Sequence, residues 1–193
     1  MLTLYDAARC PYCARVRIML AEKELEYETV AVDLDARPAW IIEMNPPSGK
    51  VPVLDEDRFV LPESVVLMEY LEERYPDPPL LTADSAERAL ARLAIWRFDD
   101  FGDPYYDLYF KRPAGSVERV EAQLAVLDCQ LEEHPYLGGQ TYGLADIAYV
   151  PWILRLAPRV GIDVSQYESI SVWLSRLLER PAIAAEAEVV ATL

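Results

Sequence analysis

The stretch "LTLYDAARCPYCARVRIML", residues 2–20, decides the fold of the N-terminal part of the chain. Its first residues, Leu2 to Tyr5, form a short apolar run that is typical of a buried strand. Good helix formers follow from Pro11 to Glu24, and a proline in the first helical turn loses no needed hydrogen bond. The pattern therefore predicts a strand that leads into a helix, with Cys10 at the start of that helix.

Cys10 and Cys13 lie one helical turn apart at this helix start. Unpaired N–H groups and the positive end of the helix dipole favour a thiolate, so we expect a lowered pKa for Cys10. Cys13 would face the same side and could attack a mixed disulfide formed on Cys10. An inert pair of packed thiols remains an alternative.

A zinc site and a structural disulfide are both disfavoured by the rest of the chain. Zinc needs about four ligands, and the chain has no second closely spaced cysteine pair and only one histidine. Three cysteines in 193 residues also do not make a disulfide framework. We therefore expect a redox site and no metal.

More strands and helices complete a small α/β domain in the order βαβαββα. The patterns predict a strand at Glu26–Val32, a helix at Pro38–Asn45, a hairpin of Val51–Leu54 and Phe59–Leu61, and a helix at Glu63–Pro76. The first two strands would be parallel, joined by a right-handed crossover. The proline-rich stretch "PDPPLLTADS" then marks the boundary of a first domain at residues 1–76.

Beyond this break the sequence contains only helical patterns. We expect one long or kinked helix over 85–110 and further helices near 117–131, 144–156 and 170–179, the last ended by Pro181. A core-facing stripe is formed by Val117, Val120, Leu124, Leu127 and Leu131. The fold class is thus α/β plus all-α, with an all-helical domain at residues 82–193.

The charge of the chain disfavours several partners. With 33 acidic and 18 basic residues, its net charge of −15 would repel nucleic acid and anionic membranes. No apolar run approaches the roughly 18 residues of a membrane span, and the first residues do not resemble a signal peptide. We expect a cytoplasmic protein.

Pro52 stands at the start of a predicted strand, where proline is poorly tolerated. A thioredoxin-like domain carries a cis proline facing its cysteines, so we expect the Val51–Pro52 peptide bond to be cis. The N–H and C=O groups of Val51 would then be free to pair with an extended, peptide-like ligand. The alternative is that Pro52 simply begins an edge strand.

Six motifs together resemble the cytosolic glutathione S-transferase superfamily over nearly the whole chain. They are "CPYC", "RPAW", "NPPSGKVPVL", "PESVVLMEYLEERYP", "HPYLGGQTYGLADIAYVPW" and "SRLLERPAI". Cys10 stands where other classes of the family have serine, which is similar to the omega-type enzymes and their glutaredoxin-like relatives. That resemblance implies glutathione as co-substrate and thiol transfer as the reaction.

The resemblance also implies a set of glutathione-binding residues. Glu63 and Ser64 would hold the γ-glutamyl end, where an anion at a helix N-terminus is favoured. Arg37 and Lys50 would lie near the glycyl carboxylate. The remaining implied contacts come from Pro11, Tyr12 and Val51. Glu63 could instead be a plain helix cap, and the two cations could be solvated surface charges.

The helical domain of the family lines an acceptor pocket and contains a buried capping box. For the pocket, the chain offers Phe98, Phe101, Tyr105, Tyr106, Tyr109 and Phe110, although such sets are more often core. For the capping box, it has Asp146 but Gly143 in place of a hydroxyl residue, so only the acid half can form. We expect His134 to be structural and Cys129 to be a buried thiol.

The sequence thus predicts a cytoplasmic glutathione-dependent thiol transferase, with Cys10 as nucleophile and Cys13 as possible resolving thiol. The partners are glutathione and a small electrophilic or disulfide substrate, and the resemblance implies a homodimer. One alternative is a regulator similar to stringent starvation protein A, a relative that binds RNA polymerase and is not an enzyme; that relative lacks the Cys-Pro-Tyr-Cys pair. Another is conjugation of glutathione to electrophiles, for which a serine or tyrosine hydroxyl is the usual donor.

Overall fold

The computed structural model describes residues 1–193, which divide into two compact units. One unit comprises residues 1–79 together with 188–193, and the other comprises residues 80–187. The domain bounds that we propose from the sequence, 1–76 and 82–193, differ from these units mainly in the place of residues 188–193.

The first unit is built on a four-stranded mixed sheet with the order β2-β1-β3-β4. Its strands are β1 (Leu2–Asp6), β2 (Tyr27–Ala31), β3 (Val53–Glu56) and β4 (Phe59–Pro62). Strand β1 pairs in parallel with β2 and antiparallel with β3, and β3 and β4 form the expected hairpin. The turn of this hairpin holds Asp57 and Arg58 at φ 51° and 78°, the left-handed backbone that tight hairpin turns require.

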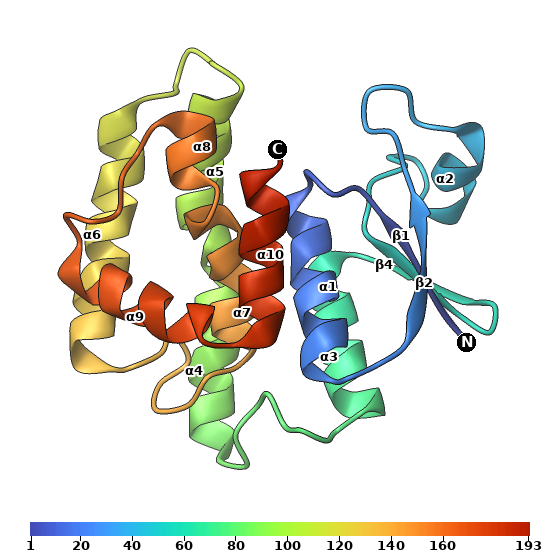
Figure 1. Ribbon diagram of the computed structural model, residues 1–193, viewed down its shortest axis with the longest axis horizontal. Helices are drawn as coiled ribbons and strands as arrows, with labels where there is room; N and C mark the ends of the chain where they lie inside the picture. Colours follow the sequence, from blue (N-terminus) through green and yellow to red (C-terminus); the bar gives the residue numbers. More distant parts are fainter. The chain divides into compact units, whose positions relative to one another are not determined.

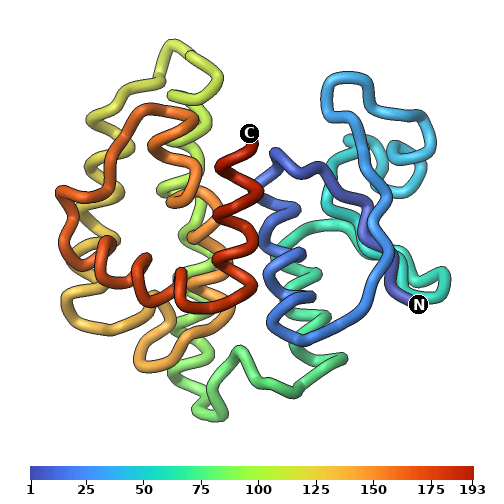
Figure 2. The backbone as a smooth tube through the Cα atoms, viewed as in Figure 1, coloured from blue at the N-terminus to red at the C-terminus, as the bar shows by residue number.

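Three helices complete this unit: α1 (Pro11–Glu22), α2 (Ala39–Met44) and α3 (Ser64–Arg74). Figure 1 shows α1 and α3 together on one face of the sheet and α2 on the other. The tube in Figure 2 follows the crossover from β1 through α1 to β2. The predicted βαβαββα order and thioredoxin-like fold are confirmed.

A buried ion pair ties the two helices on that face together. Lys23 after α1 donates a hydrogen bond to the carboxylate of Glu72 on α3, and a second one to the carbonyl oxygen of Pro78 at 2.7 Å. A buried charge needs such partners, since an unpaired one would cost several kcal/mol. The pair therefore helps to fix α1 and α3 relative to each other, and both helices begin at the candidate site.

The second unit is all-helical. Its helices are α4 (Ser85–Trp96), α5 (Phe98–Tyr109), α6 (Val117–Glu133), α7 (Leu144–Ile153), α8 (Leu156–Val160), α9 (Glu168–Leu178) and α10 (Pro181–Ala191), whose last residues belong to the first unit. Every residue of α7 is buried, so this helix forms the centre of the unit. None of the helices has both the length and the apolar character needed to cross a membrane.

Asp146 in the first turn of α7 organises the centre of this unit. Its Oδ1 accepts hydrogen bonds from the Leu137 N–H at 2.9 Å and from Trp173 Nε1 at 2.8 Å, and its Oδ2 accepts one from the Gly143 N–H at 2.9 Å. Complete burial raises the pKa of Asp146 to about 6. The three hydrogen bonds favour the carboxylate and lower the pKa, but the effect of burial is larger. The acid half of the capping box is therefore present, as the sequence indicated.

The 85–110 segment has the kinked form of the expected helix, since α4 and α5 meet at Arg97. Three details of the helical unit differ from the sequence-based expectations. Pro181 begins α10 as well as following α9. Proline suits the first turn of a helix, because its missing N–H would be unpaired there anyway. On α6, Val117 is 39% exposed, outside the buried stripe. Cys129 is also exposed, because it lies two residues from both Leu127 and Leu131 and so points away from the stripe.

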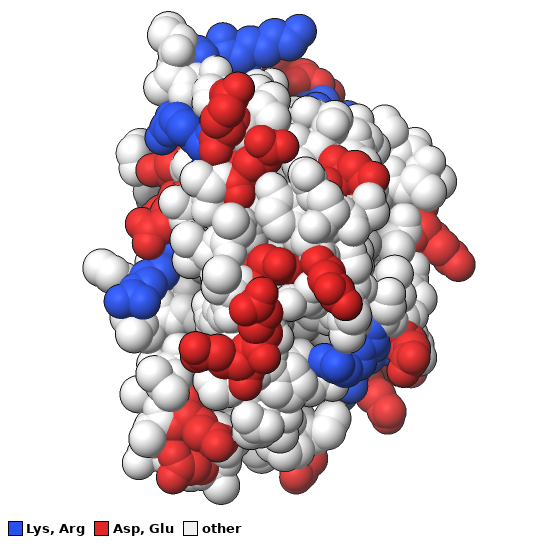
Figure 3. Space-filling view, turned by 90° about the vertical axis from the view of Figure 1, so that its left-hand side faces the viewer, with Lys and Arg blue, Asp and Glu red and all other residues white.

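The surface over the helical unit is rich in acidic side chains. Figure 3 shows one face on which Asp and Glu gather in a band along the middle, whereas Lys and Arg are few. This distribution agrees with the net charge of −15.

Candidate functional site

Cys10 is the N-cap residue of α1, and Pro11 occupies the first helical position. Its extended backbone, with φ −82° and ψ 118°, ends the turn that follows β1, and its N–H donates to the carbonyl oxygen of Ala7 at 2.8 Å. The Cys10 side chain lies at the border of the core with 9% exposed, whereas Cys13, one turn further, is completely buried. A disulfide or electrophilic substrate would therefore reach Cys10 before Cys13.

The surroundings of the two thiols give them different pKa values. The pKa of Cys10 falls to about 7, first because the Cys13 thiol donates a hydrogen bond to it and then because the N–H groups of Cys13 and Tyr12 do so. Burial and the nearby carboxylate of Asp6 oppose this fall. The pKa of Cys13 is raised by burial and by the hydrogen bond that it donates to Cys10. Near neutral pH a substantial share of Cys10 is therefore thiolate, whereas Cys13 stays a thiol.

Val51 lies beside Cys10. The Val51–Pro52 peptide bond is cis, which confirms the prediction, and the Cys10 Sγ lies 3.9 Å from the carbonyl oxygen of Val51. The N–H of this buried residue makes no hydrogen bond within the protein. Buried backbone donors are rarely left unpaired. A peptide-like ligand that places an acceptor here would satisfy the group, so the residues present fit glutathione at this point.

Glu63 and Ser64 form the start of α3. Glu63 is the N-cap residue, with φ 73°, and no side chain caps the first turn. The Glu63 side chain makes no capping hydrogen bond, and its role at the helix start stays a prediction. Ser64 is buried, and its Oγ accepts a hydrogen bond from Arg15 Nη1 at 3.2 Å. The first N–H groups of α3 have no intrahelical partner, which suits a carboxylate ligand.

Arg37 and Lys50 lie on the loop segments around α2 that lead to Val51. Both are exposed; Arg37 Nη1 donates to the carbonyl oxygen of Ser48 at 3.3 Å. The carbonyl oxygen of Lys50 accepts a hydrogen bond from Asn45 Nδ2 at 2.9 Å. Asn45 thus fixes the backbone just before Val51. No contact links Arg37 or Lys50 directly to Cys10.

The structure gathers part of the predicted set. Cys10, Cys13 and Val51 belong to one buried cluster, against which Tyr12 packs. Ser64 joins this region through its hydrogen bond with Arg15 on α1. Sequence reasoning missed Arg15, although a charged residue among the apolar residues of an expected core helix is a signal that could have drawn attention to it. Nowhere does the chain gather three or more His, Cys, Asp or Glu side chains that could hold a metal.

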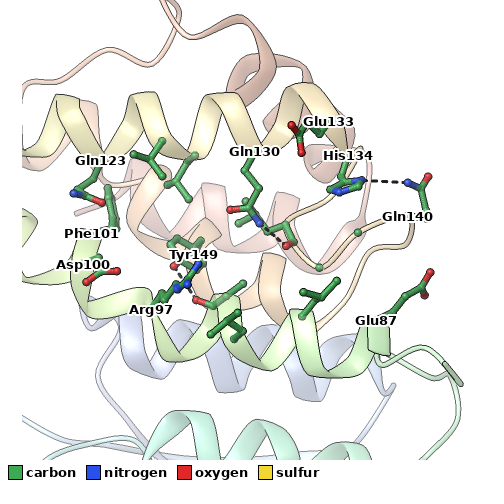
Figure 4. Close-up of a pocket in the computed structure, with 18 residues that line it drawn as sticks. Glu87, Arg97, Asp100, Phe101, Gln123, Gln130, Glu133, His134, Gln140 and Tyr149 are labelled. Carbon is green, nitrogen blue, oxygen red and sulfur yellow. Dashed lines mark hydrogen bonds between the residues drawn. The ribbon is translucent and has the colours of Figure 1, made fainter. Parts of the chain in front are cut away.

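A separate cavity of about 400 Å³ lies in the helical unit between α4, α6 and residues 134–140 (Figure 4). Of the aromatic residues expected to line a pocket, only Phe101 lines this cavity. Phe98, Phe101 and Tyr105 are buried in the core of the unit, and Phe110 is 57% exposed. At the rim, His134 Nδ1 lies 3.3 Å from Gln140 Nε2 (Figure 4). The cavity is otherwise walled mainly by apolar side chains of α4 and α6, including Leu90, Leu93 and Val126.

Comparison with known proteins agrees with this geometry. Residues 4–79 match the model of the glutathione S-transferase N-terminal domain, and residues 111–181 match that of the C-terminal domain. Pyrimidodiazepine synthase of Drosophila melanogaster is 32% identical over 98% of this chain and 83% of its own length. A stringent starvation protein A homolog of Haemophilus influenzae is also 32% identical, over 93% of this chain and 87% of its own.

Among solved structures, the theta class glutathione S-transferase of Xanthomonas axonopodis pv. citri, with glutathione bound, has a TM-score of 0.84 and 25% identity. The match covers 96% of both chains. Two family models, full-length relatives and the fold of both units thus agree. The chain belongs to the glutathione S-transferase family.

Proposed function

We propose that the protein is a glutathione-dependent thiol transferase in which Cys10 is the nucleophile. The observation that carries this proposal is the place of Cys10 as N-cap residue of α1, one turn before the buried Cys13 and 3.9 Å from the carbonyl oxygen of Val51, with its pKa lowered to about 7. A thiolate near neutral pH is the reactive form of cysteine. A conjugating enzyme would instead need a hydroxyl that stabilises the thiolate of glutathione itself.

The reaction begins with a mixed disulfide between glutathione and a small thiol. The Cys10 thiolate attacks the sulfur of the glutathione moiety, so that a Cys10–glutathione disulfide forms and the small thiol leaves as a thiolate. A second glutathione thiolate then attacks the glutathione sulfur of this intermediate, which releases oxidised glutathione and restores the Cys10 thiolate. In the alternative second step, Cys13 loses its proton and attacks Cys10, so that glutathione leaves and a Cys10–Cys13 disulfide forms, to be reduced by two further glutathione molecules.

The residues around Cys10 provide the binding groups for glutathione. The unpaired N–H of Val51 beside the thiol would pair with the peptide backbone of the ligand. Ser64, Glu63 and the free N–H groups at the start of α3 would hold its γ-glutamyl end. Arg37 and Lys50 are the cations available for the glycyl carboxylate, and Pro11 and Tyr12 would border the bound thiol.

The test compares three cysteine variants in the reduction of a mixed disulfide of glutathione and a small thiol. We expect Cys10→Ser to reduce it no faster than the uncatalysed reaction, because a serine hydroxyl is not ionised near pH 7. Cys13→Ser should retain turnover through the second glutathione molecule. Cys129→Ser is the matched control, since this exposed thiol lies on α6, outside the site. Full activity of Cys10→Ser would overturn the proposal.

A second candidate is a binding protein without enzymatic activity. Its support is the 32% identity to a stringent starvation protein A homolog, equal to that with pyrimidodiazepine synthase. A pull-down with RNA polymerase distinguishes the two, since the transferase proposal predicts turnover with glutathione and no retention of polymerase. Retention of polymerase with no turnover would favour the binding protein.

We also propose that the protein is a homodimer in the cytoplasm. The reducing conditions of that compartment would keep Cys10 and Cys13 as thiols. The support for a dimer is the presence of exposed apolar side chains on α4 and α6, with Trp96 at 78%, Leu90 at 59% and Val126 at 58% exposed. Sedimentation should show a dimer that Trp96→Glu dissociates. Leu178→Glu on α9, also at an exposed apolar position, is the matched control. A monomeric parent protein would contradict the dimer.

A further inference from the structure

Arg15 is a buried cation beside the candidate site that the proposed reaction does not use. It lies on α1 with 2% of its surface exposed, and its guanidinium carbon sits 5.2 Å from the centre of the Tyr12 ring. Its Nη1 donates a hydrogen bond to Ser64 Oγ at 3.2 Å. Arg15 therefore connects the helix that carries the cysteines to the first residue of α3.

This hydrogen bond restricts what the Ser64 hydroxyl can do. Its oxygen accepts from Arg15, and its own hydrogen has no acceptor within the protein although Ser64 is 6% exposed. A hydroxyl has one hydrogen to donate, and a buried polar hydrogen is normally paired. The Ser64 hydroxyl hydrogen is therefore available to an acceptor on a ligand, and it lies next to the uncapped N–H groups of α3.

We propose that Arg15 is a positioning residue that turns the Ser64 hydroxyl hydrogen toward the ligand. Because a guanidinium can only donate, its contact with Ser64 Oγ makes Ser64 a donor to a carboxylate rather than an acceptor. This inference rests on the proposed function, in which that carboxylate is the α-carboxylate of the γ-glutamyl group. Arg15 would thus contribute to ligand affinity without touching the ligand.

The experiment measures binding by calorimetry, so that it does not depend on thiol chemistry. The two ligands are S-methylglutathione and its analogue that lacks the γ-glutamyl α-carboxylate. The parent protein should prefer the complete ligand. Arg15→Met should weaken binding of the complete ligand by about tenfold and leave binding of the analogue unchanged. Ser64→Ala should give the same loss, and the double variant should lose no more than either single variant.

Matched variants separate positioning from folding. Arg17→Met removes a neighbouring cation of α1 that pairs with Asp6 at 2.6 Å, and it should leave the preference between the two ligands intact. If Arg15→Met does not fold, Arg15→Lys replaces it, with a smaller loss again confined to the complete ligand. Equal losses of affinity for both ligands, or additive losses in the double variant, would overturn the positioning role of Arg15 but not the proposed function. A parent protein that binds neither ligand would overturn the proposed function itself.

Discussion

Cys10 at the start of α1 and Asp146 in the first turn of α7 are two ionisable side chains at helix N-termini, one in each compact unit. Both receive hydrogen bonds that favour the anion, but the pKa of Cys10 falls to about 7 and that of Asp146 rises to about 6. The difference lies in burial and partners. Asp146 has lost all contact with water, whereas Cys10 lies at the border of the core and has the Cys13 thiol as donor.

The comparison shows how one local arrangement serves two purposes. At Cys10 the helix start and a neighbouring thiol lower the pKa of the thiol to about 7, which favours the anion. At Asp146 the carboxylate joins three donors from separate parts of the chain, so it specifies the packing of the helical unit. Substitution at the first position should therefore affect chemistry, and substitution at the second should affect stability.

The largest expected effect on stability comes from Asp146→Ala. It leaves the N–H groups of Leu137 and Gly143 and the Trp173 indole N–H without their acceptor in the core. We expect the free energy of unfolding to fall by about 3 to 5 kcal/mol, measured by urea denaturation. Cys10→Ala is the contrasting variant and should change it by only about 1 kcal/mol or less. Equal losses of unfolding free energy in the two variants would contradict the structural role assigned to Asp146.

The second prediction concerns the pH dependence of stability. The folded pKa of Asp146, about 6, lies above its ordinary value of 3.8, so the folded protein keeps a proton that the unfolded chain has lost between about pH 4 and 6. This contribution is fully present below pH 4 and is lost as the pH rises through 6, a change of about 3 kcal/mol. The parent minus Asp146→Asn difference in unfolding free energy should fall over this range. A rising difference would mean that the hydrogen bonds outweigh burial.

A smaller effect is expected from Cys13→Ala. Loss of the thiol that donates to Cys10 should raise the pKa of Cys10 from about 7 toward its ordinary value of 9. The rate of alkylation of Cys10 by iodoacetamide at pH 7 should then fall by up to about fiftyfold, because only the thiolate reacts. The pH at half-maximal rate should move upward. An unchanged pH profile would show that the helix start alone sets the reactivity of Cys10.

Much of the fold could be predicted from the sequence because its signals are local. The strand before Cys10 and the hairpin of β3 and β4 follow from short patterns, and the cis bond at Val51–Pro52 follows from the thioredoxin-like domain that these patterns predict. The helix begun by Pro181 was missed, since a proline that follows one helix also suits the first turn of the next. The contact of Arg15 with Ser64 joins residues 49 positions apart, and a sequence pattern alone does not reveal such a pairing.

The most direct test of the central claim is mass spectrometry of the protein after exposure to oxidised glutathione, with peptide mapping of the adduct. In Cys13→Ala, where no resolving thiol remains, a single glutathione should be attached to Cys10 and none to Cys129. Addition of reduced glutathione to this variant should release the adduct. An adduct on Cys129 alone, or none on Cys10, would contradict the assignment of Cys10 as the nucleophile.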